Sequence, residues 1–245
     1  MPSFLIALQV LTIFPFPSPK KMEPRYLGEG LKYFTLIGLG IGLLLAAATY
    51  WLGQFLPDLV VKAFLIGLLI VIAGGSHLDG LMDTADGLGS RRDRERMLEI
   101  MKDSRIGAYG VMAAVCILLL KFALLLSLPL QWAYLLIILM PAWGRWAFTY
   151  GACLCPYARP DGLGRPFSEY SGWKELLIAT VILLVPTLFF LKFQGIFISL
   201  GVMLVTFLLS RWMISRLGGM TGDTYGAVCE VAEITFLTLA IASLN

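Results

Sequence analysis

Long apolar runs separated by short polar segments make up most of this chain. A run of about 20 apolar residues is long enough for a helix to cross the hydrocarbon core of a membrane. Such spans are expected near residues 33–56, 60–78, 108–128, 132–154, 175–193, 196–212 and 226–244. The pattern predicts an all-α fold, a polytopic bundle of about seven transmembrane helices, in a single integral membrane domain over residues 1–245.

The first apolar stretch, residues 1–14, differs from the others in length. It is short for a span, and Pro15, Pro17 and Pro19 stop it, because proline ends a helix. We expect a short N-terminal helix that is re-entrant or interfacial. The alternation of basic loops and loops without Lys or Arg, described below, gives one consistent orientation only if this segment does not cross the membrane.

Composition agrees with a membrane protein. The chain is 58% hydrophobic and 14% charged, whereas an ordinary soluble domain has roughly 25% charged residues. The net charge is only +3, and the basic residues sit in short loops, so the chain offers no nucleic-acid-binding surface. Its expected partner is membrane lipid.

Basic residues occur in every second connection. They are Lys20, Lys21, Arg25 and Lys32 before the first span, Arg91, Arg92, Arg94, Arg96, Lys102 and Arg105 after the second, Arg159, Arg165 and Lys174 after the fourth, and Arg216 after the sixth. The connections near 57–59, 129–131 and 194–195 have no Lys or Arg. Because positive loops stay inside, this predicts that the polar motifs face the cytoplasm.

The segment 77–87 holds the most informative polar residues. In a helix, Asp79, Asp83 and Asp86 are spaced i, i+4 and i+7 and share one face. Three like charges at a membrane boundary indicate a divalent cation such as Mg²⁺, although a solvated acidic helix end is the alternative. His77, the single histidine, is either a general acid or base or a hydrogen-bonding partner.

The segment 101–110 combines cations with an expected helix start. Lys102 and Arg105 flank Asp103 and Ser104, and a helix beginning after Gly107 would offer free backbone N–H groups. This predicts a phosphate-binding cradle. The alternative is an interfacial helix whose basic side chains touch lipid headgroups.

A third polar segment lies at 216–226, before the last span. Its glycine-rich turn holds Thr221 and Gly222, and Asp223 and Glu230, seven residues apart, share a helix face. An acid inside a span is a candidate site residue. The alternative is that Glu230 forms a structural ion pair with Arg145 or Arg211.

Two further cations lie within spans. Arg145 is about 15 Å from the inner end of its span at 1.5 Å per residue, so it should face the protein interior. Lys121 lies farther from the cytoplasmic end, and we expect it to extend toward the opposite interface. Gly38, Gly40 and Gly42 predict a small packing face on the first span. The loop 156–173 is a candidate lid.

Four segments together carry a family resemblance: HLDGLMDTADGL at 77–88, MKDSRIGAYG at 101–110, GGMTGDTYGA at 218–227 and FLIALQVLTIFPFP at 4–17. In this order, and over nearly the whole chain, they resemble the cobalamin 5'-phosphate synthase family. The resemblance implies transfer of adenosylcobinamide phosphate from adenosylcobinamide-GDP to α-ribazole or α-ribazole 5'-phosphate, with release of GMP and a requirement for Mg²⁺. Homo-oligomers and association with other cobalamin-assembly enzymes are left open.

With that chemistry, each polar residue receives a role. The metal ligands are Asp79, Asp83, Asp86 and Asp223; the acid–base candidates are Asp86, Asp223 and His77; the substrate-binding candidates are Lys102, Asp103, Ser104, Arg105, Arg145, Arg211, Thr221, Gly222 and Glu230. The competing functions are a CDP-alcohol-type phosphotransferase and a polytopic transporter. The aspartate spacing departs from the first, and the chain lacks the internal repeat expected of the second.

Overall fold

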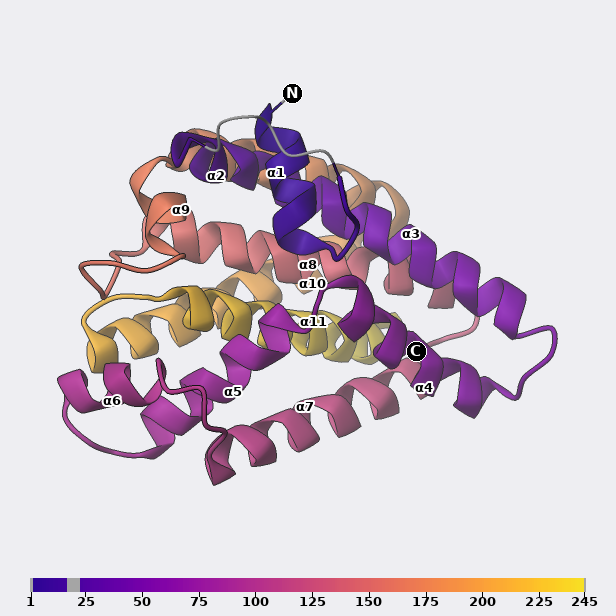
Figure 1. The fold of residues 1–245 in the computed structure, drawn as a ribbon. Helices are drawn as coiled ribbons and strands as arrows, with labels where there is room; N and C mark the ends of the chain where they lie inside the picture. Colours follow the sequence, from indigo (N-terminus) through magenta and orange to yellow (C-terminus); the bar gives the residue numbers. More distant parts are fainter. Residues whose placement is uncertain (1, 17–22, 245) are drawn as a thin grey trace.

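The chain folds as a bundle of helices (Figure 1). A computed structural model describes residues 2–16 and 23–244, so Lys20 and Lys21 lie outside the described residues. The elements are α1 (Pro2–Leu11), α2 (Arg25–Gly30), the 3-10 turn η1 (Leu31–Tyr33), α3 (Phe34–Leu52), α4 (Asp58–Ile72), α5 (Ser76–Gly89), α6 (Arg94–Ile100), α7 (Ala108–Leu126), α8 (Ala133–Leu154), α9 (Arg165–Glu169), α10 (Trp173–Leu217) and α11 (Gly222–Leu244). The predicted all-α class is confirmed.

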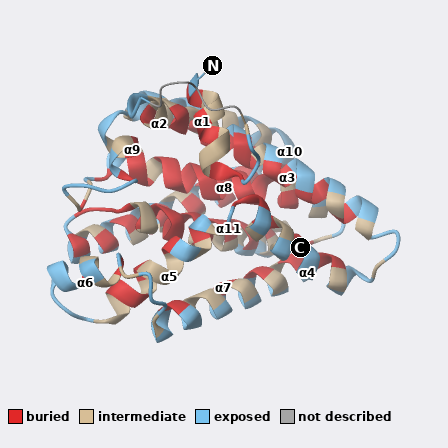
Figure 2. Cartoon of the chain, in the orientation of Figure 1, coloured by how far each residue is buried: buried red, intermediate tan, exposed pale blue. Residues whose placement is uncertain are grey.

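Helices α8 and α11 form the centre of the bundle. They pack against each other, and α3, α5, α7 and α10 pack around them. Figure 2 shows α8 as almost entirely buried and α7 as largely exposed. Outer faces carry large apolar side chains, such as Leu43 on α3, Leu119 on α7 and Phe193 on α10. Apolar surface of this extent suits contact with lipid chains.

The number of spans differs from a simple helix count. Within the described part, four helical segments are long and apolar enough to cross a membrane: Arg25–Leu52, α7, α10 and α11. Helices α4 and α5 pass the same criterion only as a pair bent by 87°. Helix α10, at 45 residues, is two helices joined at Lys192, where φ is 49° and ψ is −125°. The predicted number of seven therefore stays a prediction.

The break at Lys192 corrects one expectation. The connection between the fifth and sixth predicted spans was placed at 194–195 and expected to hold no basic residue, but the turn is at Lys192 itself. A hydrophobic pattern cannot place a turn that has no polar segment around it. The predicted orientation is not altered by one basic residue at this connection, because the strong excess of Lys and Arg remains at 91–105.

Replacing Lys192 with glycine is expected to stabilise the protein. The positive φ of 49° is a conformation that side chains disfavour and glycine tolerates. Relief of this strain should contribute about 1 kcal/mol. Thermal denaturation in detergent measures the change, with Lys174→Gly, at the ordinary helical start of α10, as the control. A Lys192→Gly variant less stable than the parent would contradict the turn.

Two of the three glycines expected to form a packing face do so. A Cβ on Gly38 would lie 2.7 Å from Ala142 Cα, and one on Gly42 would collide with Ile138, so α3 and α8 approach each other at these positions. Gly40 has open space around it, and the prediction was wrong for this residue. Residues two apart in a helix point about 200° apart, so only the pair spaced by four shares a face.

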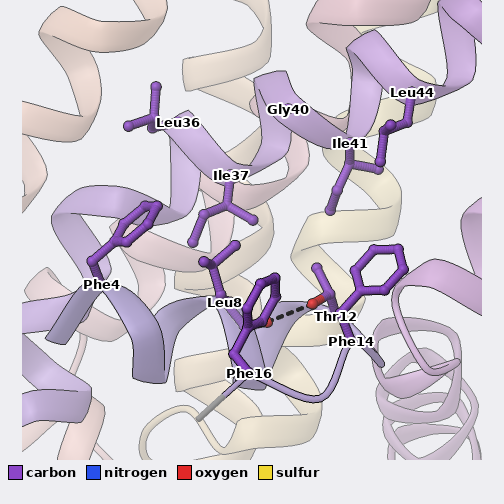
Figure 3. Close-up of a pocket in the computed structure, with 10 residues that line it drawn as sticks. All are labelled: Phe4, Leu8, Thr12, Phe14, Phe16, Leu36, Ile37, Gly40, Ile41 and Leu44. Atoms are coloured by element: carbon purple, nitrogen blue, oxygen red, sulfur yellow. Dashed lines mark hydrogen bonds between the residues drawn. The ribbon is translucent and has the colours of Figure 1, made fainter. Parts of the chain in front are cut away.

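Helix α1 lies across α3 and is about 15 Å long at 1.5 Å per residue, half of a membrane core. It is anchored by buried Ile6 and Leu11, and the following Ile13 N–H donates to Ile72 O at 2.9 Å. Between α1 and α3 is an apolar cavity of about 360 Å³ (Figure 3). It is lined by Phe4, Leu8, Thr12, Phe14, Phe16, Leu36, Ile37, Gly40, Ile41 and Leu44.

Candidate functional site

A sharp bend between α4 and α5 sets the direction of the acidic helix. Gly74 and Gly75 have φ of 62° and 69°, which glycine adopts without a steric cost. The chain turns by 87° within these residues, and α5 begins at Ser76. The span expected at 60–78 is therefore interrupted, and the segment 77–88 belongs to the separate helix α5, which runs across the bundle toward α6 (Figure 1).

The start of α11 forms the second part of the site. Thr221 and Thr224 cap it reciprocally: the Thr221 N–H donates to Thr224 Oγ1 at 2.7 Å, and the Thr224 N–H to Thr221 Oγ1 at 3.3 Å. The Thr221 hydroxyl also donates to Asp223 Oδ2 at 3.2 Å. Gly222 packs against Gly164, since a Cβ on Gly164 would lie 2.7 Å from the Gly222 nitrogen. Thr221 and Gly222 therefore position Asp223.

Helices α5 and α11 cross where Gly80 meets Asp223. A Cβ on Gly80 would lie 2.7 Å from the Asp223 carbonyl oxygen, so only glycine permits this approach. The crossing brings the acids together: the charges of Asp79, Asp223 and Asp86 all act on the Asp83 carboxyl group. A shallow cavity of about 440 Å³ lies beside them. It is lined by Gly74, Gly75, Ser76, Leu78, Asp79 and Met82.

Asp86 is already bound by the protein. Its Oδ2 accepts from the Gly107 N–H and its Oδ1 from the Gly110 N–H, both at 2.8 Å, and the residue is buried. Helix α7 does begin after Gly107, as predicted, but two of its free N–H groups bind this carboxylate. The group bound in the expected phosphate cradle is therefore the Asp86 carboxylate. Its two hydrogen bonds link α7 to α5.

The remaining residues of the predicted cradle are at the surface. Ser104 and Arg105 are exposed, and Arg105 Nη2 lies 2.6 Å from Asp103 Oδ2. Hydrogen bonds from Arg105 lower the pKa of Asp103 to about 2. Lys102 Nζ is 3.3 Å from Asp161 Oδ1, an exposed ion pair that joins this segment to the loop 156–164.

Arg94 on helix α6 makes its contacts within the protein. Arg94 Nε donates to Leu217 O at 2.7 Å, and Nη2 donates to Ala158 O at 3.2 Å. A cation at the C-terminus of a helix stabilises its free carbonyls. Arg94 therefore binds the end of α10 to the loop that covers α11.

Sequence reasoning missed Arg159 as a site residue. Its Nη2 lies 3.1 Å from Asp223 Oδ2 and 3.4 Å from Leu98 O, and its side chain is 9% exposed. The start of the candidate lid is fixed, because the Ala158 N–H donates to Met220 O and the Met220 N–H to Pro156 O, both at 2.7 Å. The sequence places a basic residue in this loop, but only the fold brings it to an acid 64 residues away.

Four ionisable side chains of α7, α8 and α11 meet inside the bundle, and we call them the buried ion cluster: Lys121, Arg145, Glu230 and Glu233. Lys121 Nζ lies 2.7 Å from both Glu230 Oε2 and Glu233 Oε2, and Arg145 Nη1 lies 2.5 Å from Glu233 Oε1. All four are buried. The cluster has two positive and two negative groups, so its charges balance and it links α7, α8 and α11.

This cluster corrects two expectations. Lys121 does not extend to the opposite interface; it is 2% exposed because two carboxylates on α11 bind it. Glu230 does form a structural ion pair, but with Lys121 and not with Arg145 or Arg211. Arg145 faces the interior as predicted, and Glu233, which binds both cations, was missed.

Two other residues that were predicted for the site, His77 and Arg211, do not line the cavity beside the aspartates. His77 is buried at the start of α5, with its ring 6.0 Å from the Phe148 ring in an edge arrangement and its backbone against Gly226. Arg211 is exposed on α10, and its charge acts on Tyr150 and Cys155 near the end of α8.

The acids offer the oxygen donors that Mg²⁺ prefers, together with phosphate oxygens of a ligand. Across the described residues, however, no group of three or more His, Cys, Asp or Glu side chains is close enough to hold one metal ion. Asp86 is bound to α7, and Asp223 is bound to Arg159. Asp79 and Asp83 are the carboxylates left for an ion, which fits a metal that arrives with a phosphorylated ligand.

Comparison with known proteins decides the family. A profile described as Cobalamin-5-phosphate synthase matches residues 3–241. The chain belongs to the cobalamin-5-phosphate synthase family. The match contains all four segments that carried the resemblance, so that prediction is confirmed. No solved structure gives a significant match.

Several cobalamin-5-phosphate synthase relatives match over nearly their whole length. Proteins named adenosylcobinamide-GDP ribazoletransferase from Acetivibrio thermocellus and Roseiflexus sp. are 39% and 42% identical, over 96% and 97% of this chain and 95% and 88% of their own. The protein of the same name from Desulfitobacterium hafniense is 41% identical over 95% of this chain and 93% of its own. The CDP-alcohol phosphotransferase and transporter alternatives are not favoured.

Proposed function

We propose that this chain is an adenosylcobinamide-GDP ribazoletransferase of cobalamin biosynthesis. The family match over residues 3–241 carries the proposal, and the acids at the crossing of α5 and α11 supply suitable chemistry. A hydroxyl oxygen of α-ribazole or its 5'-phosphate attacks the phosphorus attached to cobinamide. The bond from that phosphorus to the GMP phosphate breaks, GMP leaves, and the hydroxyl proton passes to a base.

Asp79 and Asp83 would hold Mg²⁺ against the diphosphate, because their carboxylates are not bound as those of Asp86 and Asp223 are. The ion would neutralise charge that develops on the transferred phosphoryl group. Asp223 is the best-placed base, since it lies at the N-terminus of α11 with its backbone against α5. Asp86 supports the site by fixing α7 and stays a second candidate for the base.

The phosphates of the substrate would meet cations from the neighbouring loops. Lys102 and Arg105 are exposed, and their present partners Asp161 and Asp103 are surface groups, so these ion pairs exchange easily. Glu230 and Arg145 belong to the buried ion cluster and support the helices that carry the site instead of binding substrate.

We infer that the site faces the cytoplasm of a prokaryotic inner membrane. The basic segment 91–105, which contains α6, and the loop 156–164 lie at one end of the bundle and are joined by the Lys102–Asp161 pair. Basic loops remain on the cytoplasmic side during insertion. Adenosylcobinamide-GDP would then enter the site from the cytoplasm, the compartment that supplies nucleotides.

Purified protein in liposomes should release GMP from adenosylcobinamide-GDP when α-ribazole and Mg²⁺ are both present. Chelation of Mg²⁺ should lower the rate by on the order of 10²-fold or more, because the acids then face the diphosphate without a neutralising ion. Release is measured by chromatography of GMP and of the cobalamin product. Folded protein that makes neither product with Mg²⁺ would contradict the function, and CDP-alcohol substrates would be tried next.

A further inference from the structure

Arg159 is the cation at the centre of the acidic site. It reaches Asp223 at 3.1 Å, and its charge also acts on Asp83 across the α5–α11 crossing. Other basic side chains near the site, such as Lys102 and Arg105, point to exposed surface acids. Arg159 thus neutralises part of the acid cluster.

The guanidinium group of Arg159 has binding capacity left over. Nη2 is used by Asp223 and Leu98 O, whereas the buried Nε has no hydrogen-bond partner. A buried N–H without a partner costs about 1–3 kcal/mol, so an anionic ligand that reaches Nε would remove this cost. Nε and a terminal nitrogen form the fork that binds two phosphate oxygens at once.

The position of Arg159 is set by several contacts on both sides of the residue. Ala158 is hydrogen-bonded through its N–H to Met220 O and through its carbonyl to Arg94. A few residues later, Gly164 packs against Gly222 at the start of α11. The backbone is therefore fixed, while the charged end of the side chain is held by the ion pair with Asp223 and a long hydrogen bond to Leu98 O.

We propose that Arg159 is a diphosphate-binding residue that exchanges partners when substrate binds. Without substrate it pairs with Asp223. When a nucleoside diphosphate ester arrives, its guanidinium group turns to the phosphate oxygens, and Asp223 becomes free to bind the metal ion or accept the hydroxyl proton. The inference rests on the proposed function and names a residue that couples substrate binding to release of the site carboxylate.

Two binding measurements on the full protein in liposomes test the exchange. Arg159→Gln should weaken binding of adenosylcobinamide-GDP by 10-fold or more, measured by equilibrium dialysis with Mg²⁺ and without α-ribazole. The same variant should bind Mn²⁺ several-fold more tightly in the absence of substrate, measured by electron paramagnetic resonance, because Asp223 has lost its cation. Arg159→Lys should restore the weak Mn²⁺ binding but not the tight substrate binding, since lysine lacks the fork.

The opposite directions of the two effects separate this role from a structural one. A purely structural ion pair would weaken both kinds of binding, or neither, and either result would overturn the exchange. Arg25→Gln, which breaks the exposed Arg25–Glu29 pair on α2, is the matched control and should change neither. If wild-type protein neither binds adenosylcobinamide-GDP nor releases GMP, the function fails and the role of Arg159 with it; normal wild-type behaviour beside an unchanged Arg159→Gln overturns the role alone.

Discussion

Replacing Glu233 with glutamine is expected to destabilise the protein by about 3–5 kcal/mol, because it leaves buried Arg145 without a counterion and Lys121 with Glu230 alone. Glu233 binds Lys121 through one oxygen and Arg145 through the other, and all three side chains are at most 3% exposed. Arg145 is especially sensitive, since its Nε and Nη2 already have no partner. The free energy of unfolding in bicelles, measured by SDS titration, tests this.

A matched surface variant separates the effect of burial from the effect of losing one carboxylate charge. Glu99→Gln breaks the exposed Arg96–Glu99 pair and should change the free energy of unfolding by less than about 1 kcal/mol. The double variant Lys121→Met with Glu230→Gln removes one charge of each sign, so it should cost less than the sum of its two single variants. A Glu233→Gln protein as stable as Glu99→Gln would show that the cluster does not hold the helices together.

Asp83→Asn is expected to lower turnover by on the order of 10²-fold or more without unfolding the protein. Asp83 is surrounded by the charges of three other aspartates, so neutralising it removes repulsion from the folded state while it removes a metal ligand. Thermal stability should therefore be unchanged or slightly raised. GMP release and the melting temperature, measured on the same sample, give both quantities.

Asp86→Asn is the informative comparison for this variant. The amide keeps one acceptor oxygen, but Asp86 needs two for Gly107 and Gly110, so this variant should lose stability where Asp83→Asn does not. Full turnover by Asp83→Asn would remove Asp83 from the metal site. Equal losses of stability in both variants would contradict the distinction between a free and a bound carboxylate.

The sequence predicted those parts of the molecule that depend on local pattern. The runs at 108–128, 132–154 and 226–244 were expected to be helical, and they correspond to α7, α8 and α11, because each is a largely apolar run bounded by polar residues. The helix start after Gly107 was also predicted correctly. The four sequence segments were enough for the family, since together they are specific.

The errors about charged residues concern contacts between distant segments. Lys121 and Glu233 are 112 residues apart, and Asp86 and Gly110 are 24 apart, so periodicity cannot pair them. Each pairing gives a charged group a partner inside the protein where the sequence suggested solvent, lipid headgroups or substrate. Arg159 was overlooked for the same reason, because its partner Asp223 becomes its neighbour only when the loop folds over α11.

The bend at Gly74 and Gly75 has a consequence for how the protein enters the membrane. Helix α4 has 15 residues and is about 22 Å long, shorter than the roughly 30 Å hydrocarbon core. Its continuation α5 carries three carboxylates, which the insertion machinery disfavours in lipid. Neither half is a good membrane segment at the time of synthesis. The contacts of α5 with α11 compensate for this, and because Asp223 belongs to α11, the acidic site is complete only once the C-terminal helix has been made.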